Sequence, residues 1–223
     1  MERARLVDTG PGGKEPARGG PGAVGSGQRG LALVAAQRAA WGAKESTPII
    51  LLPGRLTRWK GQLVLLEALA RLPDAAGVLV GAGEAFAAEL RARAAALGLG
   101  NRLVLAGHVE AMDVALAAAD VVVHASTDAE AFGRTVIEAQ AMARPVVAAD
   151  LGGPRETVEH GVTGWLVPPG DPAALADALA RVLAMPAPER DAIGETARAA
   201  VLRHFTTAAM QRATVQLYRE LLP

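Results

Sequence analysis

Apolar runs of strand length alternate with amphipathic helical stretches over most of the chain. The stretches between the runs repeat apolar residues at helical spacing, as at Leu63, Leu66 and Leu69. Segments that are apolar along their whole length are typical of strands buried on both faces, and strand–helix alternation indicates parallel pairing. The pattern therefore predicts an α/β fold with a doubly wound parallel sheet. The predicted strands cover 49–52, 77–80, 103–106, 121–124, 146–148 and 164–167.

The pattern becomes wholly helical after Gly170, so additional C-terminal helices are expected behind the sheet. Asp171 is placed to cap the first of them, because a carboxylate before a helix accepts hydrogen bonds from its free amides. The predicted helices cover 173–183, 189–205 and 207–222.

Glycine and proline dominate residues 9–30, a composition that buries too little apolar surface to offset the entropy of ordering. We predict that this stretch is disordered and that the Ala-rich residues 31–41 form a short helix. The resulting division is a mostly disordered or irregular segment over 1–45, one α/β domain over 46–205, and a C-terminal helix over 206–223.

Composition narrows the functional classes. The 223 residues carry 23 basic and 23 acidic side chains, so no global field draws the chain to nucleic acid, and any anion site must be local. The absence of cysteine excludes disulfides and thiolate chemistry and fits the cytoplasm. No apolar stretch reaches the roughly 20 residues of a transmembrane helix.

The loop after the first predicted strand gathers positive charge in a glycine-bounded turn. Gly54, Arg55 and Lys60 lie there, and ligands of doubly wound sheets bind beyond the carboxyl ends of strands. Arginine and lysine together can hold a diphosphate from two directions. The alternative is a solvated basic loop without a ligand.

The loop after the fourth predicted strand combines two carboxylates with a helix start. Glu130 precedes the helix and Glu138 lies within it, while the turn at Gly133 frees backbone amides that favour a phosphate. A carboxylate also accepts two hydrogen bonds from a sugar diol. The alternative is a dipole partner at Glu130 and an ordinary exposed helix residue at Glu138. A third loop, at Gly152–Gly153, permits close approach of a ligand to the backbone.

Other site types find weaker support. The glycines after the second strand begin like a dinucleotide fingerprint, but Phe86 stands at the third glycine position. No metal-ligand spacing, serine nucleophile elbow or P-loop occurs. His108 is interpreted as a loop residue near the ligand, and His124 as a satisfied strand histidine.

Taken together, the loops resemble the carboxyl-terminal, donor-binding domain of the group 1 family of retaining glycosyltransferases, which have the Rossmann-like GT-B fold. The resemblance covers about residues 49–222. The motifs that carry it are Gly54-Arg55-Leu56 with Lys60-Gly61, Glu130-Ala131-Phe132-Gly133 with Glu138, Pro145-Val146-Val147-Ala148, Gly152-Gly153, Gly161-Val162-Thr163-Gly164 with Val167, and Pro169-Gly170-Asp171.

By this resemblance, the chain binds a nucleotide-diphosphate sugar and takes part in transferring its hexosyl group with retention. The acceptor is expected to be a polysaccharide, a lipopolysaccharide or a glycolipid, and neither a metal nor another cofactor is needed. Arg55, Lys60 and Glu130 take the catalytic roles, Glu138 binds the ribose, and the base lies near His108 and Val109. The implied donor-binding residues are Gly54, Arg55, Lys60, His108, Val109, Glu130, Phe132, Gly133, Arg134, Thr135 and Glu138.

Complete members of this bacterial family also carry an amino-terminal acceptor-binding domain of comparable size. Here a disordered-looking stretch precedes Ile49, so the alternatives are a non-catalytic remnant that binds the donor and one piece of a split enzyme with a separate acceptor-binding partner. The last helix usually packs toward the missing domain, so Leu217, Tyr218 and Leu221 are expected to be exposed or repacked. Peripheral membrane contact stays open. A nucleotide-sugar epimerase ranks lower, because the only tyrosine, Tyr218, lies in the last helix.

Overall fold

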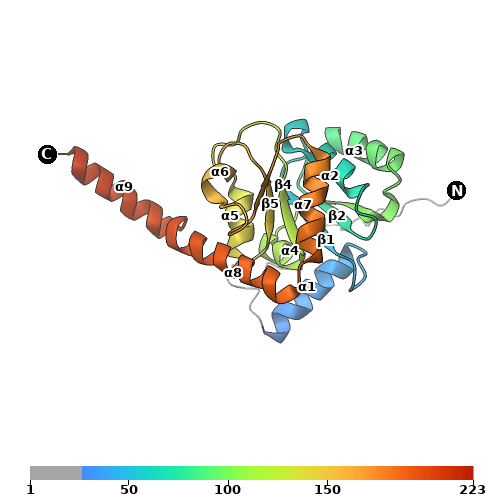
Figure 1. The fold of residues 1–223 in the computed structure, drawn as a ribbon, viewed down its shortest axis with the longest axis horizontal. Helices are drawn as coiled ribbons and strands as arrows, with labels where there is room; N and C mark the ends of the chain where they lie inside the picture. The colour runs from blue at the N-terminus through green and yellow to red at the C-terminus, as the bar shows by residue number, and fades with distance from the viewer. Residues whose placement is uncertain (1–26, 223) are drawn as a thin grey trace, which may run out of the picture.

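Six parallel strands form one sheet in the computed structural model, which describes residues 27–222 (Figure 1). The strand order is β3-β2-β1-β4-β5-β6, the order of Rossmann-fold sheets. All five neighbouring pairs are parallel. The strands are β1 (Ile49–Pro53), β2 (Ala76–Val80), β3 (Leu103–Gly107), β4 (Val121–His124), β5 (Val146–Ala149) and β6 (Trp165–Val167).

Helices connect the strands and cover both faces of the sheet (Figure 1). Two short 3-10 helices, η1 (Arg58–Lys60) and η2 (Gly100–Arg102), lie in the connections. The α-helices are α1 (Gln28–Ala40), α2 (Gln62–Leu69), α3 (Glu84–Ala96), α4 (Met112–Ala118), α5 (Arg134–Ala141), α6 (Pro154–Thr157), α7 (Pro172–Ala184), α8 (Ala187–His204) and α9 (Thr207–Leu221).

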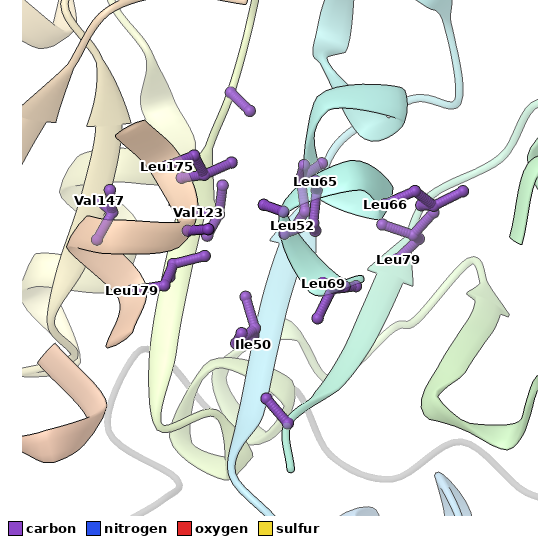
Figure 2. Close-up of a cluster of buried hydrophobic side chains, with 14 of the residues drawn as sticks. Ile50, Leu52, Leu65, Leu66, Leu69, Leu79, Val123, Val147, Leu175 and Leu179 are labelled. Atoms are coloured by element: carbon purple, nitrogen blue, oxygen red, sulfur yellow. The ribbon is translucent and has the colours of Figure 1, made fainter. Parts of the chain in front are cut away.

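The core divides into two layers because successive side chains of a strand point to opposite faces. Ile50 and Leu52 of β1 pack into the layer under α2, α3 and α7, which also holds Leu179 (Figure 2). Ile49 and Leu51 pack into the layer under α1, α4 and α5. A buried residue of this size contributes about 1.5–3 kcal/mol by leaving water, so the two-sided burial of β1 makes it the centre of the fold.

All six predicted strands are present, with ends that differ from prediction by one residue at most. The prediction of a doubly wound α/β sheet is confirmed. The predicted cap is confirmed as well, because the Asp171 carboxylate accepts hydrogen bonds from the amides of Ala173 and Ala174 at 2.9 and 3.0 Å.

The first helix begins earlier than predicted, at Gln28, so the prediction of disorder is wrong for Gln28–Gly30. Residues 9–26 of that stretch lie outside the described residues, and Gly27 is the N-cap of the helix. Arg38 of α1 explains why the helix packs here: it forms a 3.0 Å ion pair with Asp120, whose carboxylate also accepts the amide of Ile49 at 2.7 Å. Trp41 is buried in the same layer. The boundary at residue 46 stays a prediction, although α1 packs on the sheet domain.

The last helix, α9, extends away from the α/β body (Figure 1). Leu217, Tyr218 and Leu221 are exposed on it, which is one of the two outcomes expected for them. Among residues 27–222 no helix is long and apolar enough to cross a membrane.

We expect Leu179→Ala to lower the free energy of unfolding by about 2–5 kcal/mol, because it opens a cavity between α7 and the sheet. Leu202→Ala is the matched control, since Leu202 is exposed on α8; its effect should stay within about 0.5 kcal/mol. Urea unfolding followed by circular dichroism measures both. Equal losses in the two variants would contradict the assignment of the core.

Candidate functional site

The chain adds β2 and β3 on one side of β1, and β4, β5 and β6 on the other. The order of strands therefore switches between β1 and β4, and the loops that follow these two strands meet there. The chain continues from β1 into α2 on one face of the sheet and from β4 into α5 on the other. A crevice at such a switch point is where open α/β sheets bind ligands. The amide of Thr127 donates to the carbonyl of Trp59 at 2.8 Å and joins the two loops directly.

Gly61 makes this close approach possible. Its φ of 75° lies in the left-handed region, and a Cβ at this position would overlap the carbonyl oxygen of Ala125. Only glycine fits such a turn without strain. The β1–α2 loop therefore rests against the end of β4.

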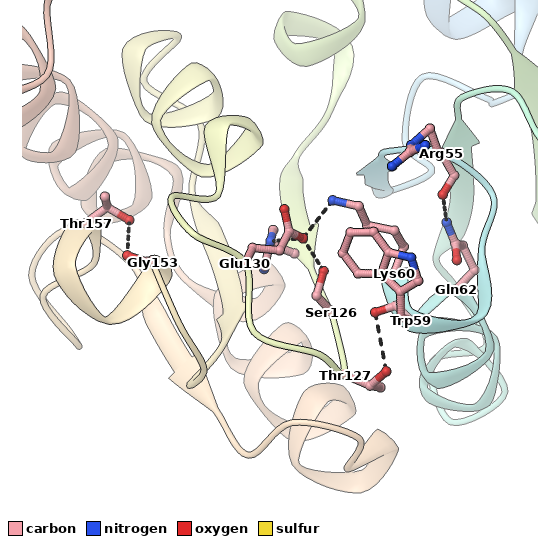
Figure 3. A network of polar contacts seen from close by, with 10 residues as sticks. Arg55, Trp59, Lys60, Gln62, Ser126, Thr127, Glu130, Gly153 and Thr157 are labelled. Atoms are coloured by element: carbon pink, nitrogen blue, oxygen red, sulfur yellow. Dashed lines mark hydrogen bonds and ion pairs between the residues drawn. The ribbon is translucent and has the colours of Figure 1, made fainter.

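Lys60 and Glu130 meet across this junction (Figure 3). The ammonium of Lys60 lies 2.7 Å from Oε1 of Glu130, and the two side chains are only 14% and 16% exposed. His124 Nε2 lies 2.8 Å from the same oxygen, which also accepts the hydroxyl of Ser126. Lys60 further lies 4.5 Å from the centroid of the Trp59 ring, in cation–π contact. One cation, one carboxylate and two polar side chains thus form a single network.

The environment of Glu130 keeps its carboxylate ionised. Burial alone raises the pKa of Glu130, but the hydrogen bonds from His124, Lys60 and Ser126 outweigh it and lower the pKa from 4.5 to about 2. The carboxylate is therefore an acceptor of hydrogen bonds at neutral pH.

The three cations of the β1–α2 loop differ in what they contact. Arg58 turns to α3, where it forms a two-pronged pair with Glu89 at 2.6 and 2.7 Å and stacks over Phe86. Arg55 is exposed, and within residues 27–222 its guanidinium makes no hydrogen bond or ion pair. Its carbonyl accepts the side-chain amide of Gln62 at 2.9 Å, which fixes the backbone of the loop (Figure 3). The charged group of Arg55 therefore has no protein partner among the described residues, while Lys60, whose ammonium has three donors, uses one of them on Glu130.

The start of α5 lies beside this network. Gly133 is its N-cap residue, with φ 73°, and no side chain caps the helix. Thr135 is half-buried in the first turn, while Arg134 is exposed and pairs with Glu138 at 3.1 Å. Phe132 is exposed and contacts the ring of Phe205 edge-on at 5.9 Å. The start of α5 therefore lies at the edge of the sheet at which the loops meet, and Glu138, half-exposed, lies one turn further along the helix.

The glycine pair after β5 has another partner than expected. A Cβ on Gly152 would press on the backbone of Glu130, and one on Gly153 would overlap the backbone of Phe132. The amide of Gly153 also donates to the carbonyl of Glu130 at 2.8 Å. The prediction that these glycines make room for a ligand is corrected: they make room for the protein's own loop.

His108 and Val109 follow β3, which β2 separates from β1. Backbone hydrogen bonds link the intervening loops, from Gly81 to Gly107 at 2.7 Å and from Gly54 to Val80 at 2.8 Å. The predicted site residues therefore lie along one edge of the sheet, and the predicted contact of His108 and Val109 with a base stays a prediction.

Sequence reasoning missed two members of the network. His124 was expected to be a satisfied strand histidine, but its Nδ1 is buried without a partner and its Nε2 serves Glu130. Ser126 was not singled out. The available signal was spacing, because both residues lie within six positions of Glu130 at the end of an apolar strand.

The sequence model of the family "Glycosyl transferases group 1" matches residues 34–200. The chain belongs to this family. It is 40% identical over 144 residues to a D-inositol 3-phosphate glycosyltransferase from Xylanimonas cellulosilytica, which covers 62% of this chain and 34% of that protein.

Solved structures agree with this assignment. A glycosyltransferase from Rickettsia africae matches with a TM-score of 0.80 and 32% identity, over 85% of this chain and 52% of that one. Anabaena HepE in complex with UDP-glucose matches with a TM-score of 0.77 and 32% identity, over 84% and 53%. The prediction of a Rossmann-like domain of the GT-B fold is confirmed. The group 1 chain spans about a third to a half of the length of these relatives.

In this group 1 domain, no group of three metal-ligating side chains comes together within the part of the chain that the structure describes.

We expect the stabilising effect of Glu130 to depend on pH. Because its pKa is lowered from 4.5 to about 2, Glu130 stabilises the fold fully above pH 4.5, and this contribution disappears as the pH falls toward 2. The difference in unfolding free energy between the wild type and Glu130→Gln should therefore shrink between about pH 5 and about pH 2. Urea titrations over that range measure it, with exposed Glu110→Gln as the baseline. A constant difference would contradict the network.

Proposed function

We propose that this chain is the donor-binding half of a retaining glycosyltransferase. A nucleotide-diphosphate sugar binds at the switch point, between the loops that follow β1 and β4, and its hexosyl group passes to a polysaccharide, lipopolysaccharide or glycolipid acceptor. The observation that carries the proposal is the network in which Lys60, a cation suited to phosphate, touches Glu130, a carboxylate suited to sugar hydroxyls. The UDP-glucose complex of Anabaena HepE supports the ligand class.

Arg55 and Lys60 supply the chemistry that the departing group requires. Negative charge grows on the diphosphate as the glycosidic bond breaks, and cations already in place lower the energy of that state without reorganising. Lys60 is held by Glu130 and by the Trp59 ring, while the backbone of Arg55 is fixed by Gln62. We propose that these two side chains make a metal or another cofactor unnecessary.

We propose that α5 contributes the remaining contacts to the donor. We propose that the first amides of this helix, from Phe132 to Thr135, contact phosphate or sugar and that Glu138 accepts the ribose hydroxyls. The uncapped N-terminus and its dipole suit an anion. Glu138 is held by a single exposed ion pair to Arg134, a type of contact that contributes little and gives way readily.

Transfer requires an acceptor-binding half, which we propose to be either another part of a longer chain or a separate partner. The alternative is a donor-binding remnant without activity. Turnover discriminates between them, because the same side chains allow binding in both cases. A chain without cysteine suits the reducing cytoplasm in which we propose that the reaction takes place.

Calorimetric titration with UDP, GDP and ADP and with their sugar conjugates tests donor binding. We expect one nucleoside diphosphate to bind with or without EDTA, and Lys60→Ala or Arg55→Ala to weaken it about 10- to 100-fold, as for a lost hydrogen bond to a charged group.

Arg58→Ala is the matched control for these variants, because Arg58 belongs to the same loop but pairs with Glu89. Its affinity should equal that of the wild type. Unchanged affinity in both Lys60→Ala and Arg55→Ala would overturn the proposed site, and loss of binding in EDTA would overturn its independence of metal.

We expect Glu138→Ala to lower the affinity for the nucleoside diphosphate about tenfold but to leave the affinity for pyrophosphate unchanged, since only the nucleotide carries a ribose. Competition between the two ligands in the same calorimeter measures this. If both ligands lose affinity equally, Glu138 acts on the helix start and not on the ribose.

A further inference from the structure

Three side-chain donors converge on a single oxygen of Glu130. Lys60 Nζ lies 2.7 Å and His124 Nε2 2.8 Å from Oε1, and the Ser126 hydroxyl donates to the same atom. Oε2 of Glu130 receives no hydrogen bond from the part of the chain that the structure describes. Oε2 is not among the fully buried polar atoms that lack a partner, so it is open to solvent and to a ligand. The network therefore saturates one oxygen and leaves the other for a ligand.

We propose that His124 and Ser126 are positioning residues that fix the Glu130 carboxylate through Oε1, so that Oε2 accepts hydroxyl groups of the donor sugar. This role deepens the proposed function and rests on it. Neither residue needs to touch the donor; both act through Glu130.

His124 and Ser126 are better placed to fix the carboxylate than Lys60 is. They are 5% and 2% exposed and lie at the end of β4, a strand buried along its whole length. Lys60 is a long side chain whose ammonium has three donors and must also serve the diphosphate. When the diphosphate draws on Lys60, the two contacts from β4 keep Glu130 in place.

The backbone of Glu130 is fixed from the opposite side. Its carbonyl accepts the amide of Gly153 at 2.8 Å, and Gly152 lies against it with no space for a side chain. The carboxylate and the main chain of one residue are thus held by residues at or just after the ends of two neighbouring strands, β4 and β5. Such double support is what a site needs to hold a group in productive geometry.

The chemistry of the contact fixes the direction of the hydrogen bond from His124. An ionised carboxylate only accepts, so Nε2 carries the proton that it donates to Glu130. Nδ1 is buried and has no partner, so no second hydrogen bond orients the ring. Packing at the end of β4 and the bond to Glu130 are therefore what hold the imidazole. Glutamine, which can place an amide N–H near the position of Nε2, is the conservative replacement.

The test compares by calorimetry the affinities of UDP, GDP and ADP with those of their sugar conjugates, each nucleoside diphosphate forming a pair with its conjugate. The ratio of the two dissociation constants in a pair, the sugar increment, reports the contacts made to the sugar alone. His124→Phe should reduce the sugar increment about tenfold, as expected when a charged group loses a supporting hydrogen bond. The affinity for the nucleoside diphosphate should stay within about twofold of that of the wild type. Ser126→Ala should act in the same direction, and His124→Gln should restore the increment.

A double-mutant cycle separates positioning from a general loss of structure. In the Glu130→Gln background, His124→Phe should change the sugar increment no further, because the carboxylate that it positions is gone. Thermal unfolding of each variant shows that it is folded. If His124→Phe weakens the nucleoside diphosphate and its sugar conjugate by the same factor, the role is structural and the proposal is overturned.

Failure of the proposed function gives a different result. A folded wild type that binds none of UDP, GDP, ADP and their sugar conjugates overturns the donor site itself. If the wild type binds the donor and both His124→Phe and Ser126→Ala keep its sugar increment, the donor site stands and only the positioning role is overturned.

Discussion

The contact between Lys60 and Glu130 joins residues that are 70 positions apart in the sequence, and the rest of the site is arranged around it. It exists only because β1 and β4 are neighbours in the sheet, which brings the loops after them together at one edge. Taking both charges partly out of water is costly, and the pair offsets that cost only when further hydrogen bonds complete it. His124 and Ser126 add hydrogen bonds on the side of the carboxylate, and the Trp59 ring adds a cation–π contact on the side of the ammonium.

The geometry of the pair depends in turn on backbone without side chains. Gly61 lets the first loop rest on the end of β4, and Gly152 and Gly153 let the loop after β5 rest on residues 130–132. Three connections that are far apart in sequence therefore pack backbone to backbone. These glycine contacts fix the distances between the loops that carry the charged groups, and the buried strands fix the direction in which each loop leaves the sheet.

Much of the fold was predictable because burial on both faces leaves a plain pattern. Strands such as Val121–His124 are continuously apolar, and a residue such as Asp171 marks a helix start by its own chemistry. The start of α1 was missed because glycine-rich sequence before it masks the helix, and because the pair between Arg38 and Asp120 that anchors it is not local.

The site was predictable only in part, because several of its contacts also join residues that are far apart in the sequence. Lys60 and Glu130 were found because charge beside glycine turns at strand ends is visible in sequence. That Lys60 touches Glu130, that His124 donates to it and that Gly152 makes room for protein instead of ligand are facts of packing between loops. Only the folded chain brings them together.

The tight contacts at Gly61, Gly152 and Gly153 also divide the site into a part that is hard to remodel and a part that is free to diverge. A side chain added at any of these three glycines must move the main chain of a second loop. The connection after β3 is less crowded: a Cβ on Gly107 would meet nothing within 4 Å, although its φ of 68° favours glycine, and His108 is exposed. Substitutions are therefore accommodated more readily at that outer edge of the sheet than at the centre of the site.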